Sequence, residues 1–378
     1  MPRLFGWGAN LSRLHLNQVA ASTGRLSPAL IPRPSKPATP ATYRTSPLRL
    51  ETVKPTSVLL TELTRSGLTC GTVGSPVIEL NIFSALPELP TDVEVTHLAA
   101  GHFFSIVGLR SHQRGEHYLA GFGVNQAGQL GDSWPAGAQP RWTSVQAGLD
   151  HSVLLDDTGR VYSMGWGADG QVGLAAGYTG YGDGLNPVGG DLADHRTYRV
   201  KKISARADYT LALTSSGHLY VWGNSEYGQG LLGEKRDRIL VPERVPDWPG
   251  LRSGVWDIAA GSTHSLVLNA ERELYVCGFG ALGTGRSDLE ALNPVRVPWP
   301  AENGRIAKVY AGLDYSACVT EEGHLYMWGF NSEFGRLGAG RAHVLTPQRV
   351  RLLEQEGPTS LRVLDVALGS HHVLVLAE

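Results

Sequence analysis

The sequence predicts an all-β protein: a seven-bladed β-propeller whose ring is closed by its first strand. Three observations predict this fold: abundant glycine, a repeated pair of strand patterns, and complementary halves of one repeat at the two chain ends. Glycine accounts for 47 of the 378 residues, whereas charged residues make up 18%. This composition favours strands joined by tight turns over a helical fold. A chain of this length is also expected to form several domains or a repeat array.

The first repeated unit is a small residue and glycine, two variable residues, His or Tyr, Ser or Thr, and then alternating apolar residues. Its copies are AAGHFFSIVGL from Ala99, QAGLDHSVLL from Gln146, SARADYTLAL from Ser204, AAGSTHSLVL from Ala259, YAGLDYSACV from Tyr310 and ALGSHHVLVL from Ala367. A degenerate copy, TCGTVGSPVIEL, starts at Thr69. The copies from Ala99 onward recur about every fifty residues, the period of four-stranded propeller blades.

A second strand pattern, ending in Trp-Gly or Phe-Gly, follows most of these copies after a short turn. Its copies are YLAGFG from Tyr118, VYSMGWG from Val161, LYVWG from Leu219, LYVCGFG from Leu274 and LYMWG from Leu325. The turns DDTG, TSSG and TEEG end in glycine, which supplies the positive φ that tight hairpins need. The paired units therefore predict one hairpin per blade.

The two chain ends predict ring closure. The last first-unit copy, which ends at Leu376, has no Trp-Gly strand after it, whereas LFGWGAN at 4–10 is a Trp-Gly strand with no first unit before it. We expect the N-terminal strand to complete the C-terminal blade, which removes an exposed sheet edge. With the copy at Thr69 the ring has seven blades, so residues 1–378 form a single propeller. Proline marks 20–50 as an irregular insertion within it.

The N-terminal composition is typical of mitochondrial targeting. Residues 1–50 contain six arginines, Lys36 and no acidic residue, a pattern found in transit peptides. Because 4–10 are expected to be part of the fold, a cleaved presequence is not expected within this chain, and a transit peptide would precede Met1 or stay uncleaved. No apolar run reaches the roughly 18 residues of a transmembrane helix.

Two glycine motifs invite a cofactor interpretation. Gly165, Gly167 and Gly170 match the G-x-G-x-x-G of dinucleotide-binding loops, and GALGTGRS at 280–287 nearly matches a P-loop. The first motif ends a hairpin strand with no helix pattern after it, and Arg286 stands where a P-loop requires lysine. We therefore expect both to be structural and predict no cofactor. The three cysteines include no C-x-x-C pair, so we predict no disulfide framework and no metal site.

The paired AG-x-x-HS and YxWG-x-N-x-x-G-Q-L-G units resemble the regulator of chromosome condensation repeat family of seven-bladed propellers, over nearly the whole chain. VYSMGWGADGQVGL, GGDLA at Gly189, LYVWGNSEYGQ at Leu219 and the Pro/Arg-rich insertion resemble its mitochondrial G-exchanging-factor-like branch. The resemblance implies a non-enzymatic mitochondrial protein, in the matrix or at the inner membrane. It implies guanine-nucleotide exchange toward a dynamin-related fusion GTPase, and ribosome biogenesis with the large-subunit rRNA and its assembly proteins. The alternative is an interaction propeller without exchange activity.

An acidic residue precedes the His/Tyr slot in three repeats. The resemblance makes these residues and one histidine candidates for GTPase contact: Asp150, Asp208, Asp314 and His371. The alternative is that Asp caps its own turn. Tyr209 and Tyr315 replace histidine in the slot that His151 and His264 occupy. Since tyrosine is not a substitute for histidine in a zinc site or as a general base, the slot predicts a shared structural hydrogen bond, and no catalytic set is expected.

The densest basic segment is HRTYRVKKISAR at 195–206. Basic side chains around an aromatic ring can hold RNA phosphates and stack a base. The candidates for RNA contact are Arg196, Tyr198, Arg199, Lys201, Lys202 and Arg206. The alternative is a solvated strand with its charges pointing outward.

Overall fold

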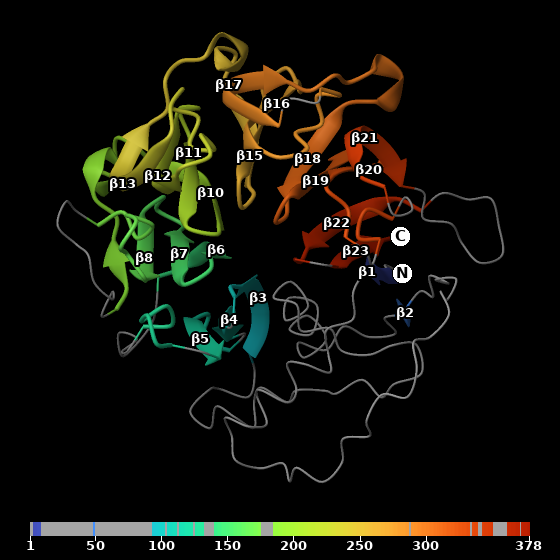
Figure 1. Ribbon diagram of the computed structural model, residues 1–378. Helices are drawn as coiled ribbons and strands as arrows, with labels where there is room; N and C mark the ends of the chain where they lie inside the picture. Colours follow the sequence, from blue (N-terminus) through green and yellow to red (C-terminus); the bar gives the residue numbers. More distant parts are fainter. Residues whose placement is uncertain are drawn as a thin grey trace, which may run out of the picture.

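The structure is a computed structural model in which six β-sheets stand around a central axis (Figure 1). Within the described residues, regular structure consists of strands and three short 3₁₀-helices, at Gly190–Ala193, Pro249–Leu251 and Ala301–Asn303. The all-β propeller prediction is confirmed. The described residues are 3–8, 48–49, 93–102, 104–111, 113–123, 125–131, 140–174, 184–286, 289–332, 335–338, 342–350, 361–370 and 372–378.

Five of the sheets are meanders in which consecutive antiparallel strands pair with their neighbours. The first has three strands: β3 (Val93–Ala100), β4 (Phe104–Ser111) and β5 (His117–Gly123). The second comprises β6 (Trp142–Ala147), β7 (His151–Asp156), β8 (Val161–Gly165) and β9 (Asn186–Pro187). The third comprises β10 (Val200–Arg206), β11 (Tyr209–Thr214), β12 (Leu219–Ser225) and β13 (Arg236–Arg244).

The next two sheets have the same plan. One comprises β14 (Val255–Ala260), β15 (His264–Asn269), β16 (Leu274–Phe279) and β17 (Glu290–Arg296). The other comprises β18 (Ile306–Ala311), β19 (Tyr315–Thr320), β20 (Leu325–Gly329) and β21 (Val344–Val350). In all four of the four-stranded meanders the first repeated unit forms the first two strands, and the Trp-Gly or Phe-Gly unit forms the third.

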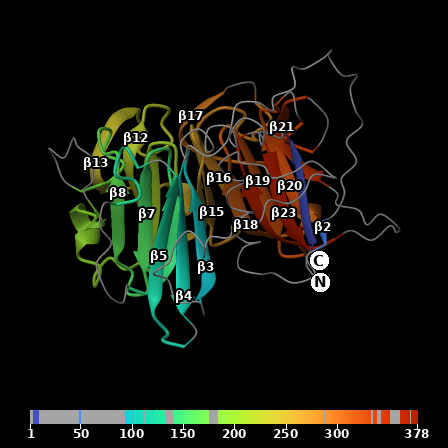
Figure 2. The same cartoon turned by 90° about the horizontal axis from the view of Figure 1, so that it is seen from below.

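The sixth sheet joins the two ends of the chain, in the order β2-β1-β23-β22. Strand β1 (Arg3–Gly8) pairs antiparallel with β23 (His372–Ala377) from Arg3 opposite Ala377 to Gly8 opposite His372. Strand β22 (Val363–Leu368) completes the inner side of the sheet. Figures 1 and 2 show the N- and C-termini beside one another. Closure of the ring by the N-terminal strand is therefore confirmed.

The insertion predicted at 20–50 has two described residues. Its last part contains β2 (Leu48–Arg49), which pairs with Arg3 and Leu4 and gives the closing sheet a fourth strand. The rest of 20–50, like the degenerate repeat from Thr69, lies outside the described residues. Six described sheets fit the seven-bladed prediction, and the single-domain assignment over 1–378 stays a prediction.

The core lies between the blades. The second strands β7, β11, β15 and β19 are buried at every residue, because each sheet packs both of its faces against neighbouring sheets. The outermost strands β13 and β17 are mostly exposed or half-buried. Apolar residues on both faces of the second strands are what this layering requires, in place of the alternation predicted there from the sequence.

Tryptophan and glycine link two blades, those of Trp222 and Trp328, to the blades before them. The indole nitrogen of Trp222 donates a hydrogen bond of 3.0 Å to the Gln171 carbonyl in the polar stretch of the preceding blade. A Cβ on Gly173, at the end of that stretch, would lie 2.9 Å from the Trp222 ring. The Trp-Gly strand and the G-Q-x-G turn are therefore two halves of one contact between blades.

The six innermost strands, β3, β6, β10, β14, β18 and β22, line a central channel of about 220 Å³. Antiparallel order places the turns between first and second strands at one end of the ring, for instance 148–150 and 207–208; we call this end the loop face. The hairpins between second and third strands, for instance 157–160 and 215–218, lie at the other end, the hairpin face. Figure 2 shows the strands running between these two ends.

Candidate interaction faces

The G-x-G-x-x-G motif lies at the end of the third strand of a blade. Gly165 ends β8 with φ 110°, and a Cβ there would lie 2.5 Å from the Asp150 carbonyl oxygen. The next residue, Trp166, donates its backbone N–H to the same oxygen at 2.8 Å. Turns follow rather than the helix that a phosphate cradle requires. The P-loop-like stretch is similar, because a Cβ on its Gly283 would lie 2.5 Å from the Trp328 indole nitrogen.

The His/Tyr slot joins neighbouring blades. Each of its side chains is buried and bonds to the following blade: His151 Nε2 to Thr210 Oγ1 (3.3 Å), Tyr209 to the His264 carbonyl (2.8 Å), His264 Nε2 to Ser316 Oγ (2.8 Å) and Tyr315 to the Gly369 carbonyl (2.7 Å). Burial lowers the pKa of His151 to about 3. Burial, and then the charge of Arg206, lowers that of His264 to about 4. Neutral rings in these positions fit the predicted structural hydrogen bond.

The three candidate aspartates all lie in turns of the loop face. Their backbone carbonyls accept N–H bonds from the residue after each β-strand glycine: Asp150 from Trp166 (2.8 Å), Asp208 from Asn224 (2.9 Å) and Asp314 from Phe330 (3.0 Å). Thr263 accepts the same bond from Phe279 at 2.8 Å. The turn therefore uses a backbone oxygen that any residue supplies, and the carboxylates are left for another role.

Asp314 is neutralised within its own blade. Arg336, whose side chain is 4% exposed, forms an ion pair with it. The guanidinium also donates to the Ser370 carbonyl at 2.7 Å and stacks on Tyr315, 4.6 Å from the ring centroid. Arg336 thus ties this turn to the closing blade, so Asp314 contributes little net charge to the loop face.

Asp208 is in a different environment. Burial, followed by the negative charges of Asp169 and Asp150, raises its pKa to about 6. Its side chain accepts a long hydrogen bond of 3.4 Å from Gln171, and within the described ranges it has no cationic partner. These carboxylates place negative charge on the loop face over β6–β13, where Arg238 lies 3.8 Å from Asp169 and offsets part of it. The fourth candidate, His371, lies outside the described residues.

Exposed apolar side chains, which the sequence alone did not predict, share this face. Leu149, next to Asp150, is 37% exposed, and Phe279 is 36% exposed with its ring 5.9 Å from that of Tyr227. Phe279 occupies the position directly after the β-strand glycine, where Trp166 and Phe330 stand in other blades. An aromatic residue at this position in several repeats is the sequence signal that predicts an aromatic loop face.

The six basic-segment candidates do not form one surface. Arg196, Arg199 and Lys201 are exposed toward the hairpin face, and Arg199 donates to the Asp157 carbonyl at 2.5 Å. Tyr198 is half-buried, its ring in edge contact with Tyr220 at 6.2 Å. The structure therefore brings together three exposed cations, while the aromatic ring of the segment packs against the core.

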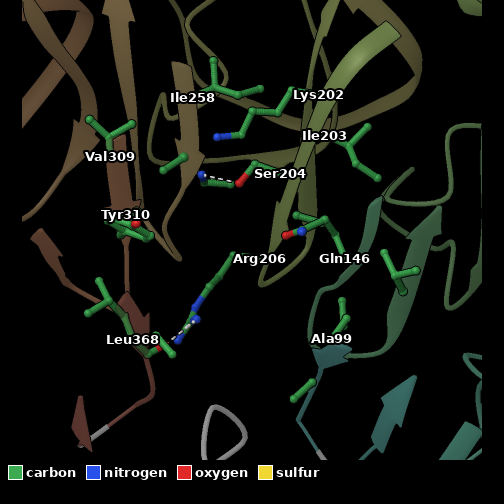
Figure 3. Close-up of a pocket in the computed structure, with 18 of the residues that line it drawn as sticks. Ala99, Gln146, Lys202, Ile203, Ser204, Arg206, Ile258, Val309, Tyr310 and Leu368 are labelled. Carbon is green, nitrogen blue, oxygen red and sulfur yellow. Dashed lines mark hydrogen bonds between the residues drawn. The ribbon is translucent and has the colours of Figure 1, made fainter. Parts of the chain in front are cut away.

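The other two cations of the segment line the channel. Lys202 forms an ion pair with Asp257 of the next blade, whose side chain is 9% exposed. Arg206 occupies the position that is glycine in the other repeats, and it donates to the Leu368 carbonyl of β22 at 3.0 Å. Figure 3 shows Arg206 extending across the channel toward Leu368, with Lys202 and Ser204 nearer the neighbouring blade.

Two kinds of feature are absent from the described part of the chain. No group of three or more His, Cys, Asp or Glu side chains there is arranged to hold a metal ion. None of its helices has the length and apolar character needed to cross a bilayer.

Comparisons with known proteins agree with the repeat analysis. The RCC1-like domain family matches residues 64–375. The mouse RCC1-like G exchanging factor-like protein is 36% identical over 243 residues, which cover 62% of this chain and 49% of that protein. The mitochondrial RCC1 domain-containing protein RUG3 of Arabidopsis thaliana is 29% identical over 265 residues, 66% of this chain and 55% of that protein. The chain thus spans about half the length of the curated relatives it matches.

Solved structures share the fold. The crystal structure of human WBSCR16 matches with a TM-score of 0.74 and 27% identity, over 100% of this chain and 99% of that one. Yeast Prp20p, whose structure was described together with its binding to Gsp1p and histones, matches with a TM-score of 0.60 and 23% identity. That match covers 78% of this chain and 71% of Prp20p, and at this identity it supports the fold alone.

Proposed function

This chain belongs to the RCC1-like domain family, and from that premise we propose that it is a non-enzymatic mitochondrial regulator that binds a GTPase through its loop face. The GTPase is of the dynamin-related fusion class, and binding accelerates release of its bound nucleotide. We propose further that the chain acts in ribosome biogenesis with the large-subunit rRNA and its assembly proteins. Relatives named as G exchanging factor-like and as mitochondrial support the proposal.

The observation that carries the GTPase role is the charge around Asp208. A carboxylate whose pKa is raised to about 6 by burial and by Asp169 and Asp150 is destabilised in its charged form. A basic partner surface would relieve that repulsion, and complementary charge speeds encounter and fixes orientation. Exposed Leu149 and Phe279 supply apolar surface that an interface can bury favourably. An exchange factor needs no covalent chemistry, only stronger binding to the nucleotide-free state.

The exchange role is tested by nucleotide release. A candidate GTPase is loaded with fluorescent GDP and mixed with the full chain or with Asp208→Asn, Asp150→Asn or their double variant. We expect acceleration by the wild-type chain, reduced at least tenfold in the double variant. Asp194→Asn, an exposed substitution at the hairpin face, is the matched control. Nucleotide release no faster than the spontaneous rate would refute the exchange role. If the chain still bound the GTPase in that case, the alternative, an interaction propeller without exchange activity, would be established.

The RNA role has its own supporting observation, the three exposed cations Arg196, Arg199 and Lys201 at the opposite face. Substituting all three with glutamate tests this role without disturbing Lys202, which forms an ion pair with the buried Asp257 carboxylate. We expect the triple variant to lose crosslinking to mitochondrial large-subunit rRNA while keeping the nucleotide-release activity of the loop face. Unchanged crosslinking would refute this basic surface. Proximity labelling in mitochondria tests the location and identifies the partners.

A further inference from the structure

The innermost strand of each described sheet has the same irregularity near the hairpin face. Its pairing with the second strand skips one residue, as in a β-bulge, which leaves that residue out of the ladder and redirects its side chain. The skipped residues, which we call the bulge ring, are Thr96, Thr143, Lys201, Trp256, Ala307 and Leu364. Since these strands line the channel, the bulge ring surrounds its mouth on the hairpin face.

Trp256 is the exceptional member of the bulge ring. It is 52% exposed, whereas Trp222 and Trp328 of the second repeated unit are fully buried. Its neighbours in the ring are the exposed Lys201 on one side and the small Ala307 on the other. About half of this indole is therefore available for contact at the surface.

Arg272 holds the indole from one side. Its guanidinium carbon lies 3.6 Å from the Trp256 ring centroid, and the arginine side chain is only 12% exposed. The guanidinium donates to the Ile306 carbonyl at 3.0 Å and lies 3.6 Å from a Glu321 carboxylate oxygen. Arg272 also has φ 69°, an unfavourable conformation for a residue other than glycine. The stack on Arg272 therefore fixes the ring plane of Trp256 in advance of binding.

The indole also borders a depression of about 510 Å³, whose other lining residues include Lys202, Lys308 and Tyr310. Its two carboxylates are already engaged. Asp257 accepts bonds from the Ile258 and Val309 amides and pairs with Lys202; Asp365 accepts from Tyr310 at 2.8 Å and lies 4.0 Å from the Lys308 ammonium. The Lys308 ammonium also donates to the Leu364 carbonyl at 3.2 Å. An ammonium carries three hydrogens, so Lys308, 53% exposed, keeps one donor for an incoming anion.

We propose that Trp256 is a base-stacking platform for single-stranded RNA, with Lys201 and Lys308 contacting the adjoining phosphates. Every base has a π-face, so a rigid ring flanked by cations binds single strands without reading their sequence. A protein partner would call for a contiguous apolar patch, whereas this indole stands alone between Lys201, Ala307 and charged groups. The inference rests on the RNA role proposed above and adds the residue that the basic segment lacks, because Tyr198 is packed against the core.

The test uses the full chain and a fluorescein-labelled single-stranded oligouridylate, with anisotropy recorded over a series of salt concentrations. We expect Trp256→Ala to weaken binding about tenfold, the loss of one stacked base, and to leave the salt dependence unchanged. Trp256→Phe keeps a π-face and should retain most of the affinity, which separates stacking from a folding defect. Lys201→Ala should instead reduce the salt slope by about 0.7. Leu345→Ala, which removes an exposed apolar side chain on the outermost strand β21, is the control and should bind like wild-type.

The outcomes distinguish the stacking proposal for Trp256 from the RNA role on which it rests. If the wild-type chain binds RNA and Trp256→Ala binds equally well, the platform is wrong and the RNA role stands. If the wild-type chain does not bind the oligonucleotide at all, the RNA role fails and the platform with it. If Trp256→Ala keeps its RNA affinity but loses a mitochondrial protein that wild-type captures, the surface is a protein-docking site and the proposal is overturned.

Discussion

The phenol of Tyr315 donates a hydrogen bond of 2.7 Å to the backbone carbonyl of Gly369, and so ties the β18–β21 blade to the closing blade. His151, Tyr209 and His264 make the corresponding connection between earlier blades. The ring is thus held by apolar faces and by buried polar bonds at each of these joints. A buried polar bond contributes modestly when made and is costly when one partner is removed.

Removing that phenol should weaken the closing joint. Tyr315→Phe leaves the Gly369 carbonyl without this donor, so we expect a loss of about 1–2 kcal/mol in the free energy of unfolding, measured by urea denaturation. Tyr310→Phe is the matched control, because its phenol bonds to Asp365 at an exposed site. The control should stay within about 0.5 kcal/mol of wild-type. Equal losses in the two variants would contradict a special role for the joint.

The closing strand gives a second prediction. Deleting residues 1–9 removes β1 and uncovers the edge of β23, so we expect a lower unfolding midpoint and self-association through the freed edge. Light scattering and thermal unfolding measure the two effects. Removing Pro2 alone, ahead of β1, is the control. A truncated chain that stays monomeric and melts with the full chain would show that β1 is dispensable.

The fold was predictable because it repeats. A single copy of VYSMGWGADGQVG suggests a dinucleotide loop, but its counterparts at Leu219 and Leu325 occupy the same position between turns, which identifies a strand and its exit. The unpaired halves at Leu4 and Leu376 predict closure, since an open edge is unfavourable. Strand β2 was not predictable, because two residues in a proline-rich stretch carry no periodicity and their pairing with β1 depends on a partner distant in sequence.

The candidate sites were predictable only in part. Asp150, Asp208 and Asp314 look equivalent in the sequence, yet Arg336 neutralises the last and neighbouring carboxylates raise the pKa of Asp208. These differences arise between segments that are remote in the chain, so no local pattern reveals them. Trp256 was missed for a related reason. A tryptophan within a strand pattern predicts a buried side chain, and only the bulge in that strand places this one at the surface.

A third prediction concerns the glycine that suggested a cofactor. Gly165→Ala forces a side chain into φ 110° and 2.5 Å from the Asp150 carbonyl, so we expect a loss of more than about 2 kcal/mol in stability. Gly184→Ala is the matched control, with φ 148° but nothing within 4 Å of the added carbon; its cost should be about 1 kcal/mol. Differential scanning fluorimetry compares them. Similar melting points would mean that the close approach to Asp150 is relieved without cost.

A fourth prediction concerns Arg206, which replaces the glycine of the other repeats. Arg206→Gly restores the repeat consensus but removes the bond across the channel to Leu368. We expect stability to fall by roughly 1 kcal/mol, measured by urea denaturation. Lys201→Ala, an exposed substitution on the same strand, is the control and should be nearly neutral. A gain in stability for Arg206→Gly would show that the consensus glycine outweighs the cross-channel bond.

The last prediction concerns His264 and Asp208, whose pKa shifts change the free energy of unfolding with pH in opposite directions. His264 has a folded pKa of about 4, below the roughly 6.5 of an unfolded histidine. The unfolded chain therefore binds more protons as the pH falls from 6.5 to 4, and the stability present above pH 6.5 is lost across that window. Asp208, with its folded pKa raised to about 6, works the other way, because the folded state binds more protons between pH 6 and about 4.

The two residues should therefore change the pH dependence in opposite directions. Unfolding free energies from urea denaturation at pH 4.5 and 7 should differ less in His264→Gln than in wild-type, because one source of acid destabilisation is gone. They should differ more in Asp208→Asn, because the opposing contribution is gone; we expect each change to be on the order of 1–2 kcal/mol. Each variant is compared with itself at the two pH values. The cost of losing the bond to Ser316 in His264→Gln is present at both, so it largely cancels. Changes of the same sign in the two variants would refute this assignment of the charges.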